Sequence, residues 1–366
     1  MKVTVTRKDF ADSLALASTA SSTRAALPVL ASIRLAAENG SLSLLGCDGE
    51  MWAESICAAN VQVPGAVCVQ RQLLSEIVGA LPDGEVLIEL EGTSVYIRQG
   101  HSEFKMMALP ADEFPPIPDV GADSELKLPF GDFRKAVAGV QYACSDDSSR
   151  PVLTGVLFNY DGTVLTLVAT DTHRLAVHKI HRSGIGSTIN VTVPAKALKA
   201  IRQLRLDAAE PITVRFDSAR LAVDTGSGKV VSQLLNGQYP NWERVVPVEH
   251  TRAWTVDRSE FQENLRRALI LAKDNANRVK FMGQGDMVII SSRSEDKGEA
   301  KEEVACVSSN GDMKIAFNGQ YVMEALAAID CDGIKTEMTE PSRPAVIRPT
   351  EGGEDHFCVV MPMAVD

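Results

Sequence analysis

The stretch "INVTVPAKALKAIRQL" (residues 189–204) decides the fold, because its pattern occurs three times in the chain. Its first part alternates apolar and polar residues as a half-buried strand does, and its second part has the spacing of an amphipathic helix. "AVCVQRQLLSEIVGAL" (66–81) and "MKIAFNGQYVMEALAAI" (313–329) show the same strand, short turn and helix. The last strand residues of the three copies are 124 positions apart in both intervals: Val69, Val193 and Phe317. A constant period of this kind indicates tandem repeats of one structural unit.

A second pattern repeats with nearly the same period. A phenylalanine followed by apolar residues four and seven positions later marks one face of a helix. It occurs at Phe10, Phe133 and Phe261, which are 123 and 128 positions apart. Alternating runs such as "TVLTLVAT" (163–170) lie between the predicted helices and are typical of half-buried antiparallel strands. We therefore expect an α+β fold of three tandem domains, comprising residues 1–120, 124–247 and 250–366.

Composition excludes several classes of protein. No run of about 18 apolar residues occurs, so we expect no membrane-spanning helix. The start "MKVTVTRKDF" becomes polar within a few residues, unlike a signal peptide. The seven cysteines are scattered without a CxxC pair, and the six histidines have no metal-ligand spacing. We expect a cytoplasmic protein with reduced thiols, no metal and no cofactor.

The charge is unevenly distributed along the chain. The net charge is -11, which argues at first sight against a nucleic-acid partner. However, the six predicted helices together carry +6, so the remainder carries -17. The predicted helices comprise residues 7–19, 71–81, 131–143, 194–205, 258–273 and 318–328. Either these basic side chains solvate exposed helix faces, or the helices form one surface that faces a polyanion. No recognition motif occurs, so the second alternative implies sequence-independent contacts with phosphates.

Taken together, several short motifs resemble those of the bacterial sliding clamps, the β processivity subunits of replicative DNA polymerases. The motifs, in chain order, are "MKVTVTRKDF", "LPVL", "LPADEFP", "ATDTHRLAV", "NGQYPNWERVVP" and "VVMPM". The resemblance covers the whole chain. It implies a head-to-tail homodimer whose six domains close into a ring around double-stranded DNA, with helices inside and sheets outside. The acidic remainder of the chain is then expected on the outward sheets.

The resemblance also implies a cleft that binds short linear motifs, a Gln followed by apolar residues, on the replicative polymerase, the clamp loader, other polymerases and repair proteins. A groove lined by Met and Val can adapt to many similar peptides. Taken alone, "VVMPM" is typical of a buried terminal strand. The positions that match the cleft are Leu153, Thr170, Thr172, His173, Arg174, Leu175, Pro240, Arg244, Val245, Ser342, Pro344, Val359, Val360, Met361, Pro362 and Met363.

Two further residue sets follow from the resemblance and from the charge pattern. The expected DNA contacts are Arg24, Arg150, Lys196, Lys199, Arg202, Arg266, Arg267 and Lys280. The expected dimer contacts are Phe104, Ile270, Leu271, Glu299, Glu302 and Glu303. The chain departs from the family pattern at Glu103 and Ala364, where basic residues are common, and at Pro151 and Val152, which replace tyrosines.

The segment "ATDTHRLAV" (169–177) also permits a catalytic hypothesis, because Asp171 and His173 are an acid/base pair in sequence. No hydrolase, zinc or phosphate-loop motif accompanies them. The first repeat has an aspartate at the same point, Asp48, but no histidine, which favours a role in the turn for both aspartates. We therefore expect no catalytic residues. A scaffold of interaction domains that binds no DNA is the third alternative, favoured by the acidic composition and disfavoured by the segregated charge.

Overall fold

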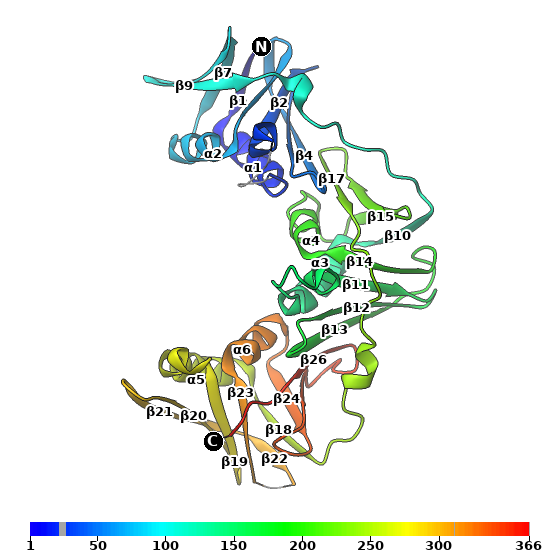
Figure 1. Ribbon diagram of the computed structural model, residues 1–366, viewed down its shortest axis with the longest axis vertical. Helices are drawn as coiled ribbons and strands as arrows, with labels where there is room; N and C mark the ends of the chain where they lie inside the picture. Colours follow the sequence, from blue (N-terminus) through cyan, green and yellow to red (C-terminus); the bar gives the residue numbers. More distant parts are fainter. Residues whose placement is uncertain (22–26, 311, 366) are drawn as a thin grey trace. The chain divides into compact units, whose positions relative to one another are not determined.

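The structure is a computed structural model that describes residues 1–21, 27–310 and 312–365. It divides into two compact units (Figure 1). Unit 1 comprises Met1–Phe133, Ile185–Ser187 and Val193–Leu234, and unit 2 comprises Arg134–Gly184, Thr188–Thr192 and Leu235–Asp366. None of the described helices is long and apolar enough to span a membrane.

Unit 1 is built on one antiparallel sheet of 13 strands. The strand order is β10-β15-β16-β17-β4-β3-β2-β6-β9-β8-β7-β1-β5. The strands are β1 (Lys2–Thr6), β2 (Ser32–Glu38), β3 (Ser41–Cys47), β4 (Met51–Ala58), β5 (Asn60–Val63), β6 (Gly65–Gln70), β7 (Glu85–Glu91), β8 (Ser94–Gln99), β9 (Ser102–Leu109), β10 (Ser124–Pro129), β15 (Pro211–Phe216), β16 (Arg220–Asp224) and β17 (Gly228–Gln233). The helices are α1 (Arg7–Ser18), α2 (Arg71–Ala80) and α4 (Ala195–Ile201).

Unit 2 contains a nine-stranded and a four-stranded sheet, ordered β14-β11-β12-β13-β26-β25-β24-β18-β22 and β21-β20-β19-β23. The strands are β11 (Gly155–Tyr160), β12 (Val164–Thr170), β13 (Arg174–His181), β14 (Ile189–Pro194), β18 (Arg252–Asp257), β19 (Arg278–Gln284), β20 (Met287–Ser294), β21 (Gly298–Ala305), β22 (Val307–Ser309), β23 (Met313–Asn318), β24 (Gly333–Met338), β25 (Ala345–Pro349) and β26 (His356–Val360). The helices are α5 (Arg258–Ala272) and α6 (Gly319–Ala328), together with most of α3 (Phe130–Val140).

The middle repeat is divided between the two units. Its strands β15–β17 extend the sheet of the first repeat, because β17 pairs with β4. Its strands β11–β14 extend the sheet of the last repeat, because β13 pairs with β26. The repeat therefore contributes to two sheets, and the compact units do not coincide with the three repeats.

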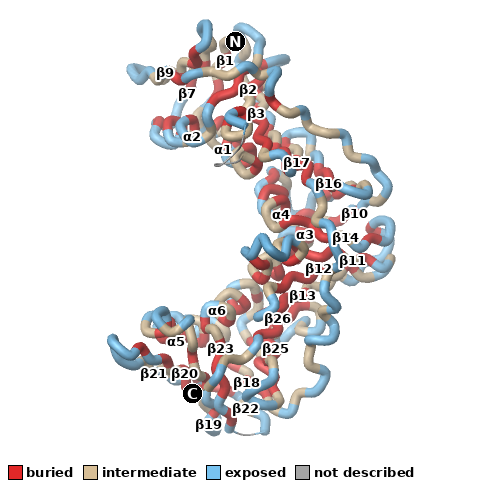
Figure 2. The backbone as a smooth tube through the Cα atoms, viewed as in Figure 1, coloured by how far each residue is buried: buried red, intermediate tan, exposed pale blue. Residues whose placement is uncertain are grey.

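The predicted helix faces are confirmed. Phe10 and Leu14 of α1, and Phe261 and Leu265 of α5, are buried in the core of their repeat, and Phe133 of α3 is 2% exposed. The buried residues, red in Figure 2, recur along the strands and helices of both units. Side chains at the N-termini hold α1 and α5 in place, since Thr6 accepts a hydrogen bond from the Asp9 N–H and Asp257 one from Glu260.

The helix predicted over 194–205 is shorter than expected. It begins at Ala195, after Pro194, and ends at Ile201. The chain then tightens into turns, in which the Leu204 N–H donates to the Ile201 carbonyl at 3.1 Å. Leu204 remains buried, so the predicted apolar stripe is kept although the helix is not continued.

Candidate functional site

The turn between β12 and β13 is organised by Asp171. Its Oδ1 accepts hydrogen bonds from the N–H groups of His173 and Arg174, both at 2.9 Å. Asp48 does the same in the first repeat, accepting from Glu50 at 3.0 Å and Met51 at 2.9 Å. The turn role predicted for both aspartates is confirmed, and this use of the Asp171 carboxylate needs no catalytic explanation.

Arg174 lies behind this turn and is 8% exposed. Its Nε donates to the second Asp171 oxygen at 3.0 Å, and its Nη2 donates to the Tyr142 carbonyl at 2.6 Å. Its Nη1 forms an ion pair with Glu324 of α6. The guanidinium carbon also lies 4.4 Å from the centre of the Tyr321 ring. Burial opposes the charge, but the carboxylates of Glu324 and Asp171 raise the pKa of Arg174 above its ordinary value.

A cleft of about 170 Å³ opens beside this turn, within unit 2. Its floor is formed by Leu175 of β13 and Val359 of β26, which lie opposite each other in the strand pair. Both belong to an apolar cluster on one face of the nine-stranded sheet, against which Trp242 packs. The complete lining is Thr170, Thr172, Arg174, Leu175, Pro240, Asn241, Trp242, Val245, Val359 and Met361.

Eight of the sixteen residues predicted for the cleft therefore line it: Thr170, Thr172, Arg174, Leu175, Pro240, Val245, Val359 and Met361. The other eight do not: Leu153, His173, Arg244, Ser342, Pro344, Val360, Pro362 and Met363. Asn241 and Trp242 were missed, although both stand inside the motif "NGQYPNWERVVP". Their position between two expected cleft residues was the signal that could have identified them.

Physical reasons explain two of these differences. Val360 follows Val359 on a strand, so its side chain points to the opposite face and is fully buried in the core with Phe261. His173 stacks on Tyr321, with ring centres 6.4 Å apart.

The basic residues predicted for DNA differ in their surroundings. Lys199 and Arg266 are exposed on α4 and α5, and Arg202 is half-buried. Lys196 donates to Asp48 at 2.8 Å and to Glu50 at 3.2 Å. Although burial acts against the charge of Lys196, these two carboxylates raise the pKa of its ammonium group. Arg24 lies outside the described residues.

Two more of these cations also have carboxylate partners. Arg150 contacts Asp147 at 3.3 Å, and Arg267 contacts Glu302 at 2.7 Å. The expectation assigned Arg267 to DNA and Glu302 to the dimer, yet the structure joins them within one chain.

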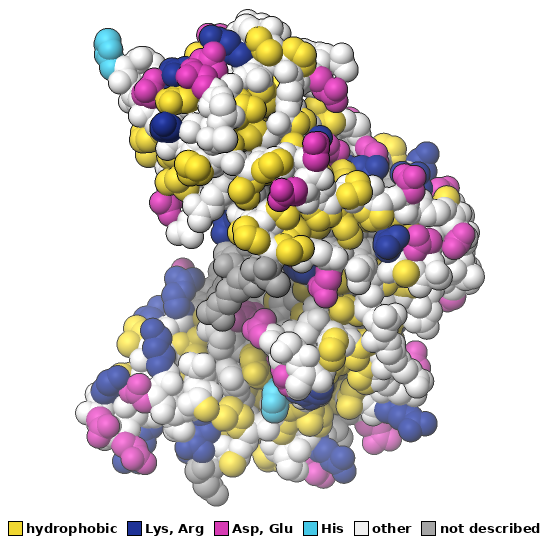
Figure 3. Space-filling model, turned by 45° about the horizontal axis from the view of Figure 1, so that its top comes forward, with side chains coloured by type: hydrophobic (Ala, Val, Ile, Leu, Met, Phe, Trp, Pro, Cys, Tyr) yellow, Lys and Arg dark blue, Asp and Glu magenta, His cyan; other side chains and the backbone are white. Residues whose placement is uncertain are grey.

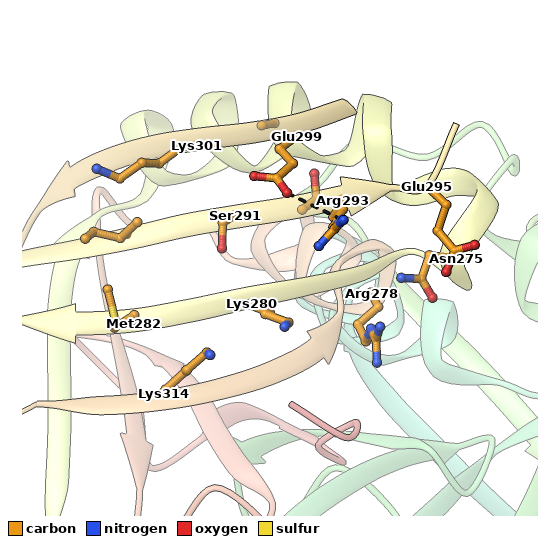
Figure 4. A pocket seen from close by; sticks show the side chains of 13 residues that line it. Asn275, Arg278, Lys280, Met282, Ser291, Arg293, Glu295, Glu299, Lys301 and Lys314 are labelled. Atoms are coloured by element: carbon orange, nitrogen blue, oxygen red, sulfur yellow. Dashed lines mark ion pairs between the residues drawn. The ribbon is translucent and has the colours of Figure 1, made fainter. Parts of the chain in front are cut away.

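Lys280 requires a correction, because it does not lie on the helix side of its sheet. It belongs to β19, where its neighbours Val279 and Phe281 are buried against α5. Its side chain points to the opposite face, together with Arg278 and Met282 (Figure 4). The expectation that the outward sheets are acidic is also wrong at this face. Five cations but only two carboxylates line it. On the surface visible in Figure 3, Lys and Arg side chains are interspersed with Asp and Glu.

Four of the six residues predicted for a dimer contact lie on two strands that each have an open edge among the described residues, and the other two, Ile270 and Leu271, lie on α5. β21 carries Glu299, Glu302 and Glu303 and ends its sheet, and most of β9, which carries Phe104, pairs on one side only. Ile270 of α5 is 64% exposed, whereas Leu271 and Phe104 are half-buried. The unusual Glu103 has a partner in its own sheet, since Arg98 Nε donates to it at 2.5 Å.

No group of three or more His, Cys, Asp or Glu side chains suited to a metal ion occurs among the described residues. All seven cysteines are free thiols.

Comparisons with known proteins agree over the whole chain. Residues 1–118, 127–241 and 243–364 match the N-terminal, central and C-terminal domains of the DNA polymerase III beta subunit family. The beta sliding clamp of Staphylococcus aureus is 32% identical over 99% of both chains. The crystal structure of the Thermotoga maritima DNA polymerase III beta subunit is similar with 26% identity, complete coverage of both chains and a TM-score of 0.89. A sliding clamp from Pseudomonas aeruginosa, solved bound to griselimycin, is 25% identical with a TM-score of 0.87, covering 100% of this chain and 99% of that one.

Proposed function

Because this chain belongs to the DNA polymerase III β-subunit family, the family of the β sliding clamps, we propose that two copies close into a ring around duplex DNA and tether polymerases through the cleft of unit 2. As a sliding clamp, the protein serves the processivity of DNA polymerase. The proposal includes the ring, the partners of the cleft, the DNA contacts, a cytoplasmic location and the absence of catalytic activity. We also propose the domain limits 1–120, 124–247 and 250–366.

The observation that carries the proposal is the apolar cleft. Its floor is rigid, because Leu175 and Val359 are 3% and 2% exposed and lie on paired strands. Its rim is accessible, because Val245 and Met361 are 49% and 39% exposed. A small apolar depression with polar Thr170 and Thr172 at one side suits a peptide that carries two or three apolar side chains after a Gln. The partners we propose are polymerases, the clamp loader and repair proteins with such motifs.

The open edges of β9 and β21 support the proposed homodimer. In a head-to-tail ring, β9 of one copy pairs with β21 of the other, which satisfies backbone groups that are otherwise solvated. The exposed side chains of Ile270 and of Met107, which is 73% exposed, then become buried, and Phe104 and Leu271 lie beside them. Glu299, Glu302 and Glu303 occupy the charged side of this seam.

The proposed DNA contacts are weak and independent of sequence. Lys199 and Arg266 are exposed cations on α4 and α5. Arg150 and Arg202, and Arg24 outside the described residues, are proposed to add to them. Lys196, Arg150 and Arg267 already have carboxylate partners. A phosphate must therefore compete with Asp48, Glu50, Asp147 or Glu302. Such competition reduces the net gain per contact, which suits a ring that slides.

Two measurements test the proposal. A fluorescent peptide with a Gln-apolar motif should bind the protein, and Leu175→Asp should abolish binding because it places an unpaired carboxylate in the floor. Leu73→Asp, at an exposed position of unit 1, is the matched control. Equal affinity of both variants for the peptide would reject the cleft.

The ring is tested on nicked circular DNA. Protein assembled by a clamp loader should remain bound at high salt and should be lost when the circle is linearised, because the attachment is topological. Retention after linearisation would reject encirclement.

A further inference from the structure

The four-stranded sheet of unit 2 has a hollow on the face that points away from α5, of about 910 Å³. Figure 4 shows side chains of β19, β20, β21 and β23 converging on it. Five cations line the hollow and only two carboxylates do. The cations are Arg278, Lys280, Arg293, Lys301 and Lys314, and the carboxylates are Glu295 and Glu299. We call this surface the basic hollow.

The positive charge of the basic hollow is concentrated on β19 and β23. Arg293 is paired with Glu299 at 3.4 Å, and Lys301 is paired with Glu303 at 2.7 Å. No carboxylate of the described residues forms an ion pair with Lys280 or Lys314. An anion therefore gains most next to these two lysines.

The basic hollow adjoins the cleft through the end of the chain. Met361 lines the cleft, and the Met363 N–H donates to the Ala316 carbonyl of β23 at 2.8 Å. Ala316 lies directly opposite Lys280 in the pairing of β23 with β19. Two residues of extended chain span about 7 Å, and neighbouring strands lie about 4.8 Å apart. Lys280 is thus on the order of 10 Å from the backbone of the cleft's rim.

The lining favours a peptide over a nucleic acid. The basic hollow has an apolar floor, Met282 and Ile289, and none of its lining residues is aromatic. Single-stranded nucleic acids are held largely by stacking on aromatic rings. An extended peptide presents alternate side chains about 7 Å apart, the spacing of Arg278, Lys280 and Met282 along β19. Alternating carboxylates therefore match this face.

We propose that the basic hollow binds acidic residues flanking the Gln-apolar motif of partner proteins. The inference rests on the proposed function of the cleft. Under this proposal, the affinity of a partner depends on the charge of the residues that flank its motif. Partners with the same motif then differ in affinity when their flanking residues differ in charge.

The test uses fluorescence anisotropy on the full-length protein. Three kinds of peptide are compared: the motif alone, the motif extended at either end by alternating Asp and Ser, and the same extensions with Asn in place of Asp. The variants are Lys280→Glu with Lys314→Glu, and a control with the same change of net charge at exposed lysines of unit 1, Lys8→Glu with Lys127→Glu.

One of the two acidic extensions should increase affinity relative to its Asn counterpart by about 2- to 30-fold at low salt, the range of two exposed ion pairs. This gain in affinity should vanish in the Lys280/Lys314 variant and persist in the control variant. It should also decrease at about 0.5 M salt, where charges are screened over about 4 Å.

Two results would overturn the inference: no gain from either acidic extension, or a gain that survives in the Lys280/Lys314 variant. In the first case, binding of a single-stranded oligonucleotide to the hollow would identify a nucleic acid as its occupant instead. Failure of the unextended motif to bind the wild-type protein is a different result. It would reject the cleft itself, and the hollow as its extension.

Discussion

Arg174→Ala should destabilise unit 2 strongly, because Arg174 does more than line the cleft. Its buried side chain connects Asp171, the Tyr142 carbonyl and Glu324, and we call this set of contacts the strut. The substitution removes hydrogen bonds to Asp171 and to the Tyr142 carbonyl together with the ion pair to Glu324. Removing one member of a buried ion pair typically costs about 3 to 5 kcal/mol. Glu324 is one-third exposed and can be rehydrated, so we expect about 3 kcal/mol.

Differential scanning calorimetry measures this effect. For a unit of this size, about 3 kcal/mol corresponds to a decrease in Tm of roughly 6 to 12 °C. Arg266→Ala, which removes an exposed arginine of the same unit, is the control and should change stability by less than about 0.5 kcal/mol. Equal Tm values for the two variants would refute the strut.

A double-mutant cycle separates the strut from the cleft. Arg174→Met and Glu324→Gln should each lower the free energy of unfolding, because each leaves the other residue without its partner in the ion pair. The double variant removes both charges, so its loss of stability should be about 0.5 to 3 kcal/mol smaller than the sum of the two single losses. If the two single effects add, Arg174 and Glu324 are not energetically coupled. Peptide affinity should decrease in Glu324→Gln as well, although Glu324 does not line the cleft.

Three further predictions concern other parts of the chain. Burial lowers the pKa of His178 to about 4 and also lowers that of the adjacent His356, so both are neutral in the folded state at neutral pH. The contribution of the two neutral histidines to the free energy of unfolding is complete above pH 6.5 and is lost as the pH falls towards 4. Urea unfolding should show a decrease of roughly 2 to 4 kcal/mol over this range. In His178→Gln the free energy of unfolding should depend less on pH. Ile270→Asp should dissociate the proposed dimer in sedimentation velocity, whereas Val248→Asp, at a 93% exposed position, should leave it intact. Gly283→Ala should lower the Tm, because its Cβ would lie 2.5 Å from Trp254 Nε1, whereas Gly79→Ala in α2 has open space and should not.

The sequence predicts local features of the fold well and distant pairings poorly. The buried faces of α1, α3 and α5 follow from spacing alone, since burial of one helix face is a property of consecutive residues. The turn role of Asp171 could likewise be predicted from its repeat, Asp48. The ion pair between Arg174 and Glu324 spans 150 positions, and no local pattern encodes it. Lys280 was misplaced because only its charge was considered. Its alternation with the apolar Val279 and Phe281 in "RVKFMGQ" (278–284) would have placed it on the face opposite the core.

The cleft and the strut are two faces of one strand pair. Leu175 and Val359 form the floor of the cleft, and their neighbours Arg174 and Val360 are opposite each other in the same ladder. Val360 is buried in the core of the last repeat, and Arg174, at the edge of the cleft, pairs with Glu324 of α6. Because a strand cannot shift by one residue without exchanging its faces, the floor cannot move unless the core of the last repeat moves with it. In the proposed complexes, adaptation to different peptides is therefore left to the rim, where Met361 and Val245 are exposed, and to the basic hollow beyond Met363. If all proposed partners share the floor, we expect the charge of the residues outside the motif to distinguish one partner from another.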